Sequence, residues 1–365
     1  MKKLNIFLTT VFILFLILPI IDNIFKISPI KNLFEKRLPA EMPKNPKNFK
    51  EVKKYLSKFE NFFNDNYGFR KSLVSVNSWI MDDIFNESPN DRALVGKDGW
   101  LYFDNNNSLI DAQGLAKIDE KKIKIAVNSF IRNWQKLKAQ NIDYVLVIAA
   151  DKTSIYPEFL PNYIKVSNKN HRIDKFIKIL RKKSADFPLL DLRPILLEAK
   201  KNEIIYHETD THWNARGAHY GYVEIMKKIR QEYDSRHDFE EIASAGFKGD
   251  ISDIMNVDNT NIDYNLKPKN EPKYRQIALS QEIMRKFHNP EFFESDNKNL
   301  PILFVYKDSF FDNMLYFFTQ NFSKSYLINE FPCDLDLKLI KSYKPNIVIQ
   351  QFWEGRIEEV INKCK

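Results

Sequence analysis

The chain has 365 residues, of which 44% are apolar and 28% charged, a composition typical of globular proteins that excludes a disordered or fibrous chain. Nine residues are glycine, where average usage gives roughly 25. No two glycines are spaced two apart, so the dinucleotide-binding motif G-x-G-x-x-G is absent. The phosphate-binding motif Gly-Lys-Ser/Thr is absent as well. The net charge is +8, but basic and acidic residues alternate without a nucleic-acid-binding motif, so we expect no nucleic-acid partner.

The first predicted element is a membrane-spanning helix over residues 1–25. Residues 4–21 carry no charge and follow two lysines; as a helix they measure about 27 Å, close to the hydrocarbon thickness of a bilayer. No small-x-small cleavage site follows, which favours an uncleaved signal anchor over a cleaved signal peptide. The basic residues on the two sides nearly balance, but a three-residue head has no room for a function. We therefore expect a single-pass membrane protein whose bulk lies outside the cytoplasm, in the periplasm or at the cell surface.

A linker and a helical stalk are predicted over residues 26–90. Residues 26–46 contain four prolines and alternating charges, which is typical of a linker. From Phe49 to Phe63 apolar residues recur at three- and four-residue spacing, which predicts an amphipathic helix that ends at the turn cluster 64–68. A second helix is expected from Arg70 to about Phe85.

Residues 91–365 are predicted to form one α/β domain. Short apolar runs alternate with amphipathic stretches such as 119–139 and 171–183, which we expect to be helices. The predicted strands are 100–103, 144–148, 187–192, 302–306, 325–328 and 346–350. This alternation favours a mostly parallel sheet flanked by helices. Residues of about 237–299 are polar and irregular, and we expect them to be an insertion at one end of the sheet.

Polar side chains follow three of the apolar segments, which is where ligands and chemistry collect in parallel sheets. These groups are Asp151-Lys152-Thr153 after 144–148, His207 to His219 after 204–206, and Lys307-Asp308-Ser309 after 302–306. The chemistry of the domain is therefore expected among these residues.

Asp210, His212 and Ser309 are the candidate catalytic residues. Asp210 and His212 lie two apart, so an extended segment points both side chains to one side. The carboxylate can then hold one ring nitrogen while the other faces a substrate. Ser309 is the best candidate nucleophile, because it lies between a buried strand and the predicted helix 310–321, whose first amides can stabilise an oxyanion. Its neighbours do not form G-x-S-x-G, which disfavours an α/β-hydrolase nucleophile elbow.

Other interpretations of these residues stay open. A serine at a strand end is commonly a helix cap, and an Asp-x-His pair is commonly a surface hydrogen bond. Four residues also offer zinc ligands, namely His207, Glu208, Asp210 and His212. H-E-x-x-H is absent because residue 211 is threonine, and we expect no metal. Cys333 and Cys364 match no metal-binding spacing and make no disulfide framework.

Several motif blocks together resemble the alginate O-acetyltransferase (AlgJ/AlgX-like) family. In chain order they are DNYGFR at 65–70, GKDGWLY at 96–102, DKTSIYP at 151–157 with LP at 160–161, DTHW at 210–213, GDI at 249–251, DSF at 308–310 and Glu354-x-Arg356. Their order and spacing cover roughly residues 50–360, and DTHW followed by DSF is the most specific part. The family usually has glycine before Asp-Ser, where this chain has Lys307.

The resemblance implies an SGNH-hydrolase-like catalytic domain in which Asp210, His212 and Ser309 are the triad. Oxyanion or substrate contacts are further expected from Lys152, Trp213, Gln351 and Arg356. The family also implies transfer of acetyl groups to an exported polysaccharide such as alginate. No cofactor is expected, because a multi-pass membrane-bound O-acyltransferase (MBOAT) supplies the acetyl group.

The sequence therefore predicts a membrane-anchored O-acetyltransferase that acts through a Ser309 acyl-enzyme on an exopolysaccharide or a cell-envelope glycan. Two alternatives remain at this point. One is an acetylesterase with the same triad, and the other is a catalytically weak SGNH-like scaffold, altered at Lys307, that recruits the membrane acyltransferase.

Overall fold

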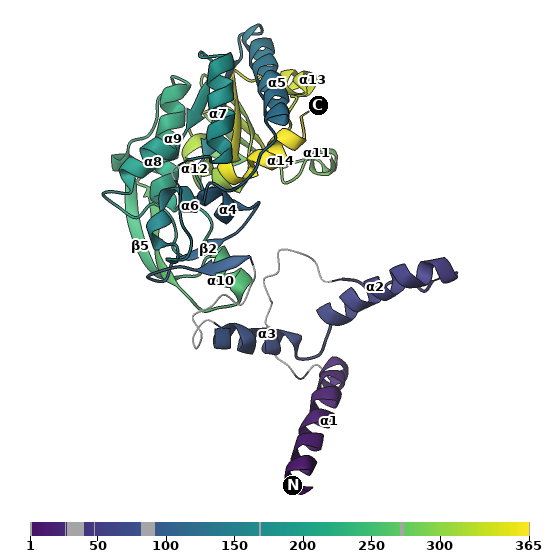
Figure 1. The fold of residues 1–365 in the computed structure, drawn as a ribbon. Helices are drawn as coiled ribbons and strands as arrows, with labels where there is room; N and C mark the ends of the chain where they lie inside the picture. Colours follow the sequence, from purple (N-terminus) through teal and green to yellow (C-terminus); the bar gives the residue numbers. More distant parts are fainter. Residues whose placement is uncertain are drawn as a thin grey trace. The chain divides into compact units, whose positions relative to one another are not determined.

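The computed structural model describes residues 2–25, 27, 40–46, 48–81, 92–167, 169–270 and 274–364 (Figure 1). The chain divides into two compact units, one formed by 1–93 with 250–259 and the other by 94–249 with 260–365.

The first unit is helical. Its helices are α1 (Lys2–Phe25), α2 (Phe49–Asp65), α3 (Arg70–Trp79) and α10 (Asp250–Met255). Within the described ranges, α1 is the one helix long and apolar enough to cross a membrane, over Lys2–Asp22, by length and composition. Helix α2 begins where its amphipathic pattern begins, because the Asn48 side chain accepts from the Glu51 amide as an N-cap. The predicted end of the second helix near Phe85, and most of the predicted linker, lie outside the described residues.

The turn between α2 and α3 is held against the end of α1. The amide of Phe69, whose φ is 59°, donates to the Asp22 carboxylate over 2.8 Å. A Cβ on Gly68 would come within 1.9 Å of the carbonyl oxygen of Pro19, so only glycine allows this approach. The motif block at 65–70 thus shapes a helix–helix turn.

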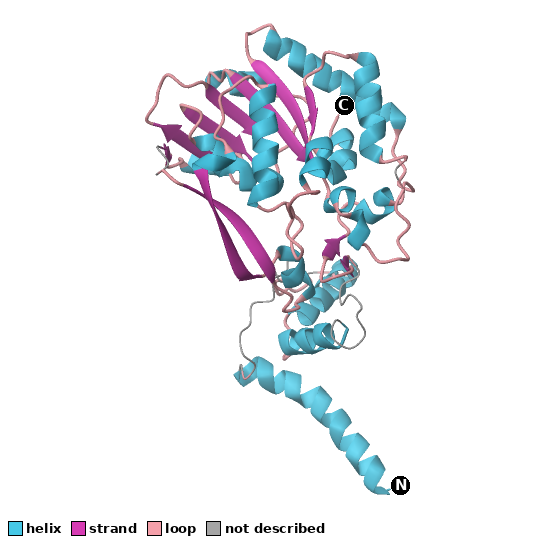
Figure 2. Cartoon of the chain, turned by 90° about the vertical axis from the view of Figure 1, so that its left-hand side faces the viewer, coloured by secondary structure: helices cyan, strands magenta, loops and turns pink. Residues whose placement is uncertain are grey.

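The second unit is built on a seven-stranded mixed sheet in the order β4-β3-β11-β9-β10-β8-β7 (Figure 2). The strands are β3 (Asp143–Ala149), β4 (Leu189–Asp191), β7 (Tyr274–Gln276), β8 (Glu291–Ser295), β9 (Ile302–Tyr306), β10 (Lys324–Ile328) and β11 (Ile347–Trp353). From β4 to β10 the neighbours run parallel, and β8 and β7 join antiparallel. The predicted mostly parallel α/β sheet is confirmed.

Helices cover both faces of this sheet, because the strands alternate apolar side chains between two cores. One core receives Val145 and Val147 of β3 and packs against α6 (Lys152–Ile155), α8 (Arg193–Ala199), α9 (Ala215–Lys228) and α12 (Asp312–Thr319). The other receives Leu146 and Ile148 and packs against α5 (Glu120–Lys138), α7 (Arg172–Lys183), α13 (Leu337–Ser342) and α14 (Ile357–Asn362) (Figure 1).

Two expectations about the apolar segments are corrected. The predicted strand 100–103 forms β2 (Leu101–Phe103), which pairs with β1 (Ala93–Val95) outside the main sheet. Residues 204–206 form no strand; Tyr206 makes a single bridge to Trp213. Their apolar character reflects burial in the core, since Ile205 and Tyr206 are both fully buried.

The segment 237–299 is not irregular. It contains the antiparallel hairpin of β5 (Phe239–Phe247) and β6 (Asn261–Pro268), the short helix α11 (Gln281–Lys286), and the sheet strands β7 and β8 (Figure 2). Strand β5 could not be predicted from the sequence. Most of its residues are exposed on both faces, so it has no period-two pattern of apolar residues. Short helical elements complete the described chain: α4 (Ser108–Ala112), η2 (Pro157–Phe159), η3 (Arg236–Asp238), η4 (Ser309–Phe311) and η5 (Glu354–Arg356).

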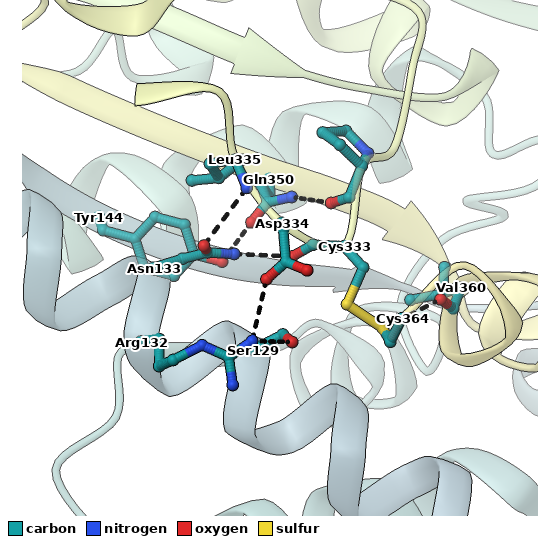
Figure 3. Close-up of a disulfide and its surroundings, with 11 residues drawn as sticks. Ser129, Arg132, Asn133, Tyr144, Cys333, Asp334, Leu335, Gln350, Val360 and Cys364 are labelled. Atoms are coloured by element: carbon teal, nitrogen blue, oxygen red, sulfur yellow. Dashed lines mark hydrogen bonds and ion pairs between the residues drawn. A yellow bond between two sulfur atoms is a disulfide. The ribbon is translucent and has the colours of Figure 1, made fainter. Parts of the chain in front are cut away.

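A disulfide joins Cys333 to Cys364, a pairing that the sequence did not indicate (Figure 3). It links the segment after β10 to the end of α14. The side chain of Asn133 on α5 donates to the Cys333 carbonyl over 2.7 Å and accepts from the Leu335 amide at 3.3 Å. The C-terminal helix is thereby fixed to the layer that contains α5.

Candidate active site

Ser309 lies at the carboxyl end of β9, in the first turn of η4. Strand β9 is buried from Leu303 to Tyr306, and the chain then turns because Asp308 caps η4 by accepting from the Phe310 amide at 3.0 Å. Ser309 is exposed, whereas Asp308 and Phe310 on either side are buried. The turn therefore presents one hydroxyl group, with its own amide among the N–H groups that the first helical turn does not use.

The carboxylate of Asp308 ties this turn to the neighbouring strand β11. Its oxygens accept from the Gln351 side-chain amide at 2.8 Å and from the Trp353 backbone amide at 2.6 Å. The Asp308 amide in turn donates to the side-chain oxygen of Gln351 at 3.2 Å. Burial raises the pKa of Asp308, while its hydrogen bonds favour the carboxylate and oppose that shift.

Asp210 and His212 lie in a tight loop between Tyr206 and Trp213, which form a β-bridge. Inside the loop the His207 amide donates to the His212 carbonyl at 3.2 Å. Lys152 connects this loop to strand β2. Its buried ammonium donates to the carbonyl oxygen of Glu208 in the loop at 3.0 Å and to that of Leu101 on β2 at 2.8 Å.

Gly249 packs directly on the same loop. A Cβ at this position would come within 2.3 Å of the Thr209 carbonyl, and the Gly249 amide donates to the Thr209 hydroxyl at 3.1 Å. The glycine of the GDI block is thus required by close approach to the residue before Asp210.

The structure brings Asp210, His212 and Ser309 into one chain of hydrogen bonds. Nδ1 of His212 lies 2.7 Å from Oδ1 of Asp210, and Nε2 lies 2.8 Å from Oγ of Ser309. The same Asp210 oxygen accepts from the His212 backbone amide at 2.9 Å. The side chains of His212 and Asp210 are 21% and 14% exposed, so the imidazole is accessible yet oriented. Both ring nitrogens of His212 are engaged, an arrangement in which the imidazole can take a proton from the Ser309 hydroxyl.

Beside the triad the loops and the hairpin enclose a groove of about 960 Å³. Its wall includes His207, Asp210 and His212 from the loop, Phe247, Asp263, Asn265 and Lys267 from the hairpin, and Asp312, Asn313 and Tyr316 from α12. Charged, amide and aromatic groups therefore mix along it, a lining suited to a hydroxyl-rich ligand. This wall could not be predicted from the sequence, because the exposed residues of β5 carry no apolar strand pattern.

The four residues expected to contact the substrate or the oxyanion make hydrogen bonds to other groups of the protein. Gln351 uses both ends of its amide on Asp308, and Lys152 holds the loop carbonyls. The Trp213 indole donates to the Phe310 carbonyl, and the Arg356 guanidinium donates to Glu359 at 2.9 and 3.0 Å. The contacts of Gln351, Lys152 and Trp213 hold the serine turn or the loop of Asp210 and His212, whereas Arg356 bonds within its own C-terminal segment. Contact of these four residues with a substrate stays a prediction.

Lys307 replaces the family glycine without obstructing the serine turn. Its side chain is 2% exposed, and its ammonium lies 3.2 Å from Glu291 on β8 and forms a second ion pair with Asp312 on α12. A buried lysine is tolerated here because two carboxylates neutralise it.

Comparison with known proteins identifies the family. Residues 93–290 match the family described as SGNH hydrolase-like domain, acetyltransferase AlgX. The chain belongs to this family. The resemblance predicted from the motif blocks is confirmed, and the match includes Asp210 and His212 but ends before Ser309.

Curated relatives of this AlgX-type chain include two proteins named probable alginate O-acetylase AlgJ. The one from Pseudomonas syringae pv. tomato is 27% identical over 212 residues, which cover 56% of this chain and 51% of that protein. The one from Pseudomonas aeruginosa is 25% identical over 169 residues, covering 44% of this chain and 39% of that protein. The chain thus spans about half the length, or less, of the curated relatives it matches.

Among solved structures, the AlgX-type fold is similar to that of Bacillus cereus PatB1, with a TM-score of 0.57 and 18% identity over 76% of this chain and all of that one. PatB1 with a sulfonyl adduct gives a TM-score of 0.54, 18% identity, and coverage of 74% and 99%. At this identity the similarity shows the shared SGNH-like fold.

Proposed function

We propose that this protein is an extracytoplasmic O-acetyltransferase that transfers acetyl groups to hydroxyls of a glycan through an acetyl-enzyme on Ser309. The observation that carries the proposal is the hydrogen-bonded chain from Asp210 through His212 to an exposed Ser309. The family match supports the proposal, because these three residues would act in an AlgX-type SGNH-like domain.

In the first half-reaction the Ser309 oxygen attacks the carbonyl carbon of an acetyl ester donor. Nε2 of His212 takes the serine proton, and Asp210 stabilises the imidazolium through Nδ1. The bond from the carbonyl carbon to the donor oxygen then breaks, and His212 returns the proton to that oxygen. The Ser309 amide, at the start of η4, is placed to stabilise the oxyanion.

In the second half-reaction a glycan hydroxyl attacks the acetyl-serine. His212 now removes the proton from the hydroxyl, the bond to the Ser309 oxygen breaks, and the proton returns to the serine. The two half-reactions balance in atoms and charge without a metal ion or a redox cofactor. The groove beside His212 is the natural place for the glycan, and relatives named alginate O-acetylase support a polysaccharide acceptor.

Membrane anchoring and a partner acyltransferase belong to the same proposal. Helix α1 supports an anchor by its length and composition, and a disulfide is stable in the oxidising compartments outside the cytoplasm. An acetyl group made available at the membrane by an MBOAT would reach a domain tethered there. A reporter fused after residue 45 should then be active only outside the cytoplasm, and a cytoplasmic signal would overturn the export.

The test of catalysis compares Ser309→Ala with Ser342→Ala, an exposed serine on α13 of the same domain. Hydrolysis of a chromogenic acetyl ester and acetylation of the cell's own polysaccharide are both measured. Ser309→Ala should lower both by about 10⁴-fold or more, and Ser342→Ala should change neither. Full glycan acetylation by Ser309→Ala would refute the proposal, and ester hydrolysis without any transfer by the unaltered protein would identify an acetylesterase instead.

A further inference from the structure

A second histidine lies in the wall of the groove, five residues before His212. His207 is 7% exposed, and its ring stacks on Phe247 of the hairpin at 4.3 Å between centroids and 21° between planes. Its backbone amide donates to the His212 carbonyl. The stack thus orients the imidazole ring, and the backbone hydrogen bond ties His207 to the residue proposed as the base.

Within the described part of the chain, neither ring nitrogen of His207 has a hydrogen-bond partner. Nδ1 is fully enclosed and has no hydrogen-bond partner, and it lies 3.5 Å from Oδ1 of Asp263, just beyond hydrogen-bond length. Among the described residues none accepts from or donates to Nε2. Buried polar atoms in folded proteins are almost always paired, so an unpaired one calls for a reason.

The surroundings of His207 indicate its charge. Burial lowers the pKa of His207, and this effect outweighs the opposing influence of the Asp210 and Asp263 carboxylates; Lys152 and His212 lower it further. A neutral imidazole has one N–H donor and one acceptor nitrogen. With Nδ1 facing a carboxylate, the proton belongs on Nδ1, and Nε2 is left as an acceptor.

We propose that His207 and Asp263 form an acceptor-binding pair that recognises a sugar hydroxyl of the glycan. Nδ1–H donates a hydrogen bond to Asp263 when a small side-chain shift closes the 3.5 Å gap, and Nε2 accepts a hydrogen bond from the sugar hydroxyl. This inference rests on the proposed function, and it names the residues that select the acceptor of the second half-reaction.

The neighbours of the pair suit such a ligand. The Asn265 amide donates to the second oxygen of Asp263 at 2.6 Å, which fixes the carboxylate. Asn265, Asn270 and Tyr316 also line the groove and offer further groups for hydroxyls. The pair would act on the fate of the acetyl-enzyme, since a bound sugar hydroxyl competes with water for the same acetyl group.

The experiment measures how acetyl-enzyme divides between glycan and water in the full-length protein. The donor is a chromogenic acetyl ester, and the acceptor is the exported polysaccharide of the producing cell after base-catalysed removal of its acetyl groups. His207→Phe keeps the stack on Phe247 but removes both ring nitrogens, and Asp263→Asn keeps the side-chain shape. His207→Gln restores a polar atom near Nε2. The matched control is His237→Phe, an exposed histidine of the same domain.

His207→Phe and Asp263→Asn should each lower the ratio of transfer to hydrolysis by tenfold or more and raise the KM for the polysaccharide. His207→Gln should recover part of the loss, and His237→Phe should match the unaltered protein. An unchanged ratio in His207→Phe, or a parallel fall of both reactions, would overturn the inference. If His207→Phe does not fold, the same ratio in Asp263→Asn decides.

Binding without chemistry separates this inference from the proposed function. In the Ser309→Ala background, His207→Phe should weaken binding of the deacetylated polysaccharide at least tenfold. Equal binding by the two proteins would refute the His207 assignment while the triad stands. An unaltered protein that hydrolyses the ester but never acetylates the polysaccharide would refute the proposed function itself.

Discussion

The indole N–H of Trp213 donates to the carbonyl oxygen of Phe310 across 3.0 Å, in a fully buried contact between residues 97 positions apart. Trp213 follows His212, and Phe310 follows Ser309. The Trp213 side chain therefore links the histidine loop to the backbone of the serine turn, next to the proposed base and nucleophile.

Replacing Trp213 by phenylalanine should impair turnover as well as stability. The Phe310 carbonyl loses its buried donor, which costs about 1–3 kcal/mol of unfolding free energy, and the histidine and serine are no longer held together. Urea unfolding and ester hydrolysis measure the two effects. Trp134→Phe on α5, which removes an indole packed on Phe187 away from the site, should lower stability without changing kcat. Equal kcat in the two variants would contradict a role of the Trp213–Phe310 hydrogen bond in turnover.

Asp308→Asn should disturb the serine turn. The carboxylate accepts three N–H groups, from Phe310, Gln351 and Trp353, and the amide of asparagine turns its own N–H₂ toward at least one of them. We expect about 1–3 kcal/mol of lost stability and at least a tenfold fall in kcat. Asp334→Asn, at an exposed ion pair with Arg132, should cost less than about 1 kcal/mol. An Asp308→Asn protein with unaltered kcat would show that the hydrogen bonds of the Asp308 carboxylate do not position Ser309.

Glu354 should make stability depend on pH. It follows β11, accepts from the Asp151 amide at 2.5 Å, and burial raises its pKa from 4.5 to about 8. The folded protein thus holds a proton that the unfolded chain releases. Its contribution to stability is fully present below about pH 4.5 and is lost as the pH rises through about 8.

Glu354→Gln resembles the protonated form and should remove this dependence. Between pH 5.5 and 7.5 the unfolding free energy of the unaltered protein should fall relative to Glu354→Gln by up to about 1.4 kcal/mol per pH unit. Glu198→Gln, at an exposed pair with Lys201, should follow the unaltered protein. Parallel curves for Glu354→Gln and the unaltered protein would rule out a proton on Glu354.

Reduction of the disulfide should destabilise the catalytic domain. Cys333 and Cys364 are 31 residues apart, and closing a loop of this length stabilises a protein by about 2–4 kcal/mol. The double variant Cys333→Ser/Cys364→Ser should unfold at correspondingly lower urea concentration. A thiol reductant should lower the midpoint of the unaltered protein to that of the double variant and leave the double variant unchanged. A midpoint insensitive to reductant would mean that the bond contributes nothing.

The long helices and the parallel strands could be predicted because each carries its own local signal. Residues 144–148 are a continuous apolar run, and 119–139 has helical spacing throughout. Strand β7 could not be predicted, since it has three residues and gains its strand conformation only by pairing with β8. The β5–β6 hairpin is largely exposed, so its sequence resembles a polar loop.

The candidate site shows the same division. Asp210 and His212 could be named as candidates from their spacing, and Ser309 from its place between strand and helix, but their assignment as a triad depends on the resemblance to the family. The partners of Asp308 could not be predicted, because they depend on β11 lying next to β9, and nothing local in 302–309 or 347–353 specifies that order. From the sequence, His207 is only an alternative metal ligand, and its contacts with Phe247 and Asp263 could not be predicted because both partners lie on the hairpin.

The position of β11 has a consequence for biosynthesis. This strand lies inside the sheet between β3 and β9, yet it follows every other described strand in the sequence. A nascent chain emerging N-terminus first has a gap in its sheet until residues 347–353 arrive, and Asp308 has no Gln351 or Trp353 to hold it. Domains fold as units during synthesis, so here Ser309 is set in place only after residues 347–353 have been made.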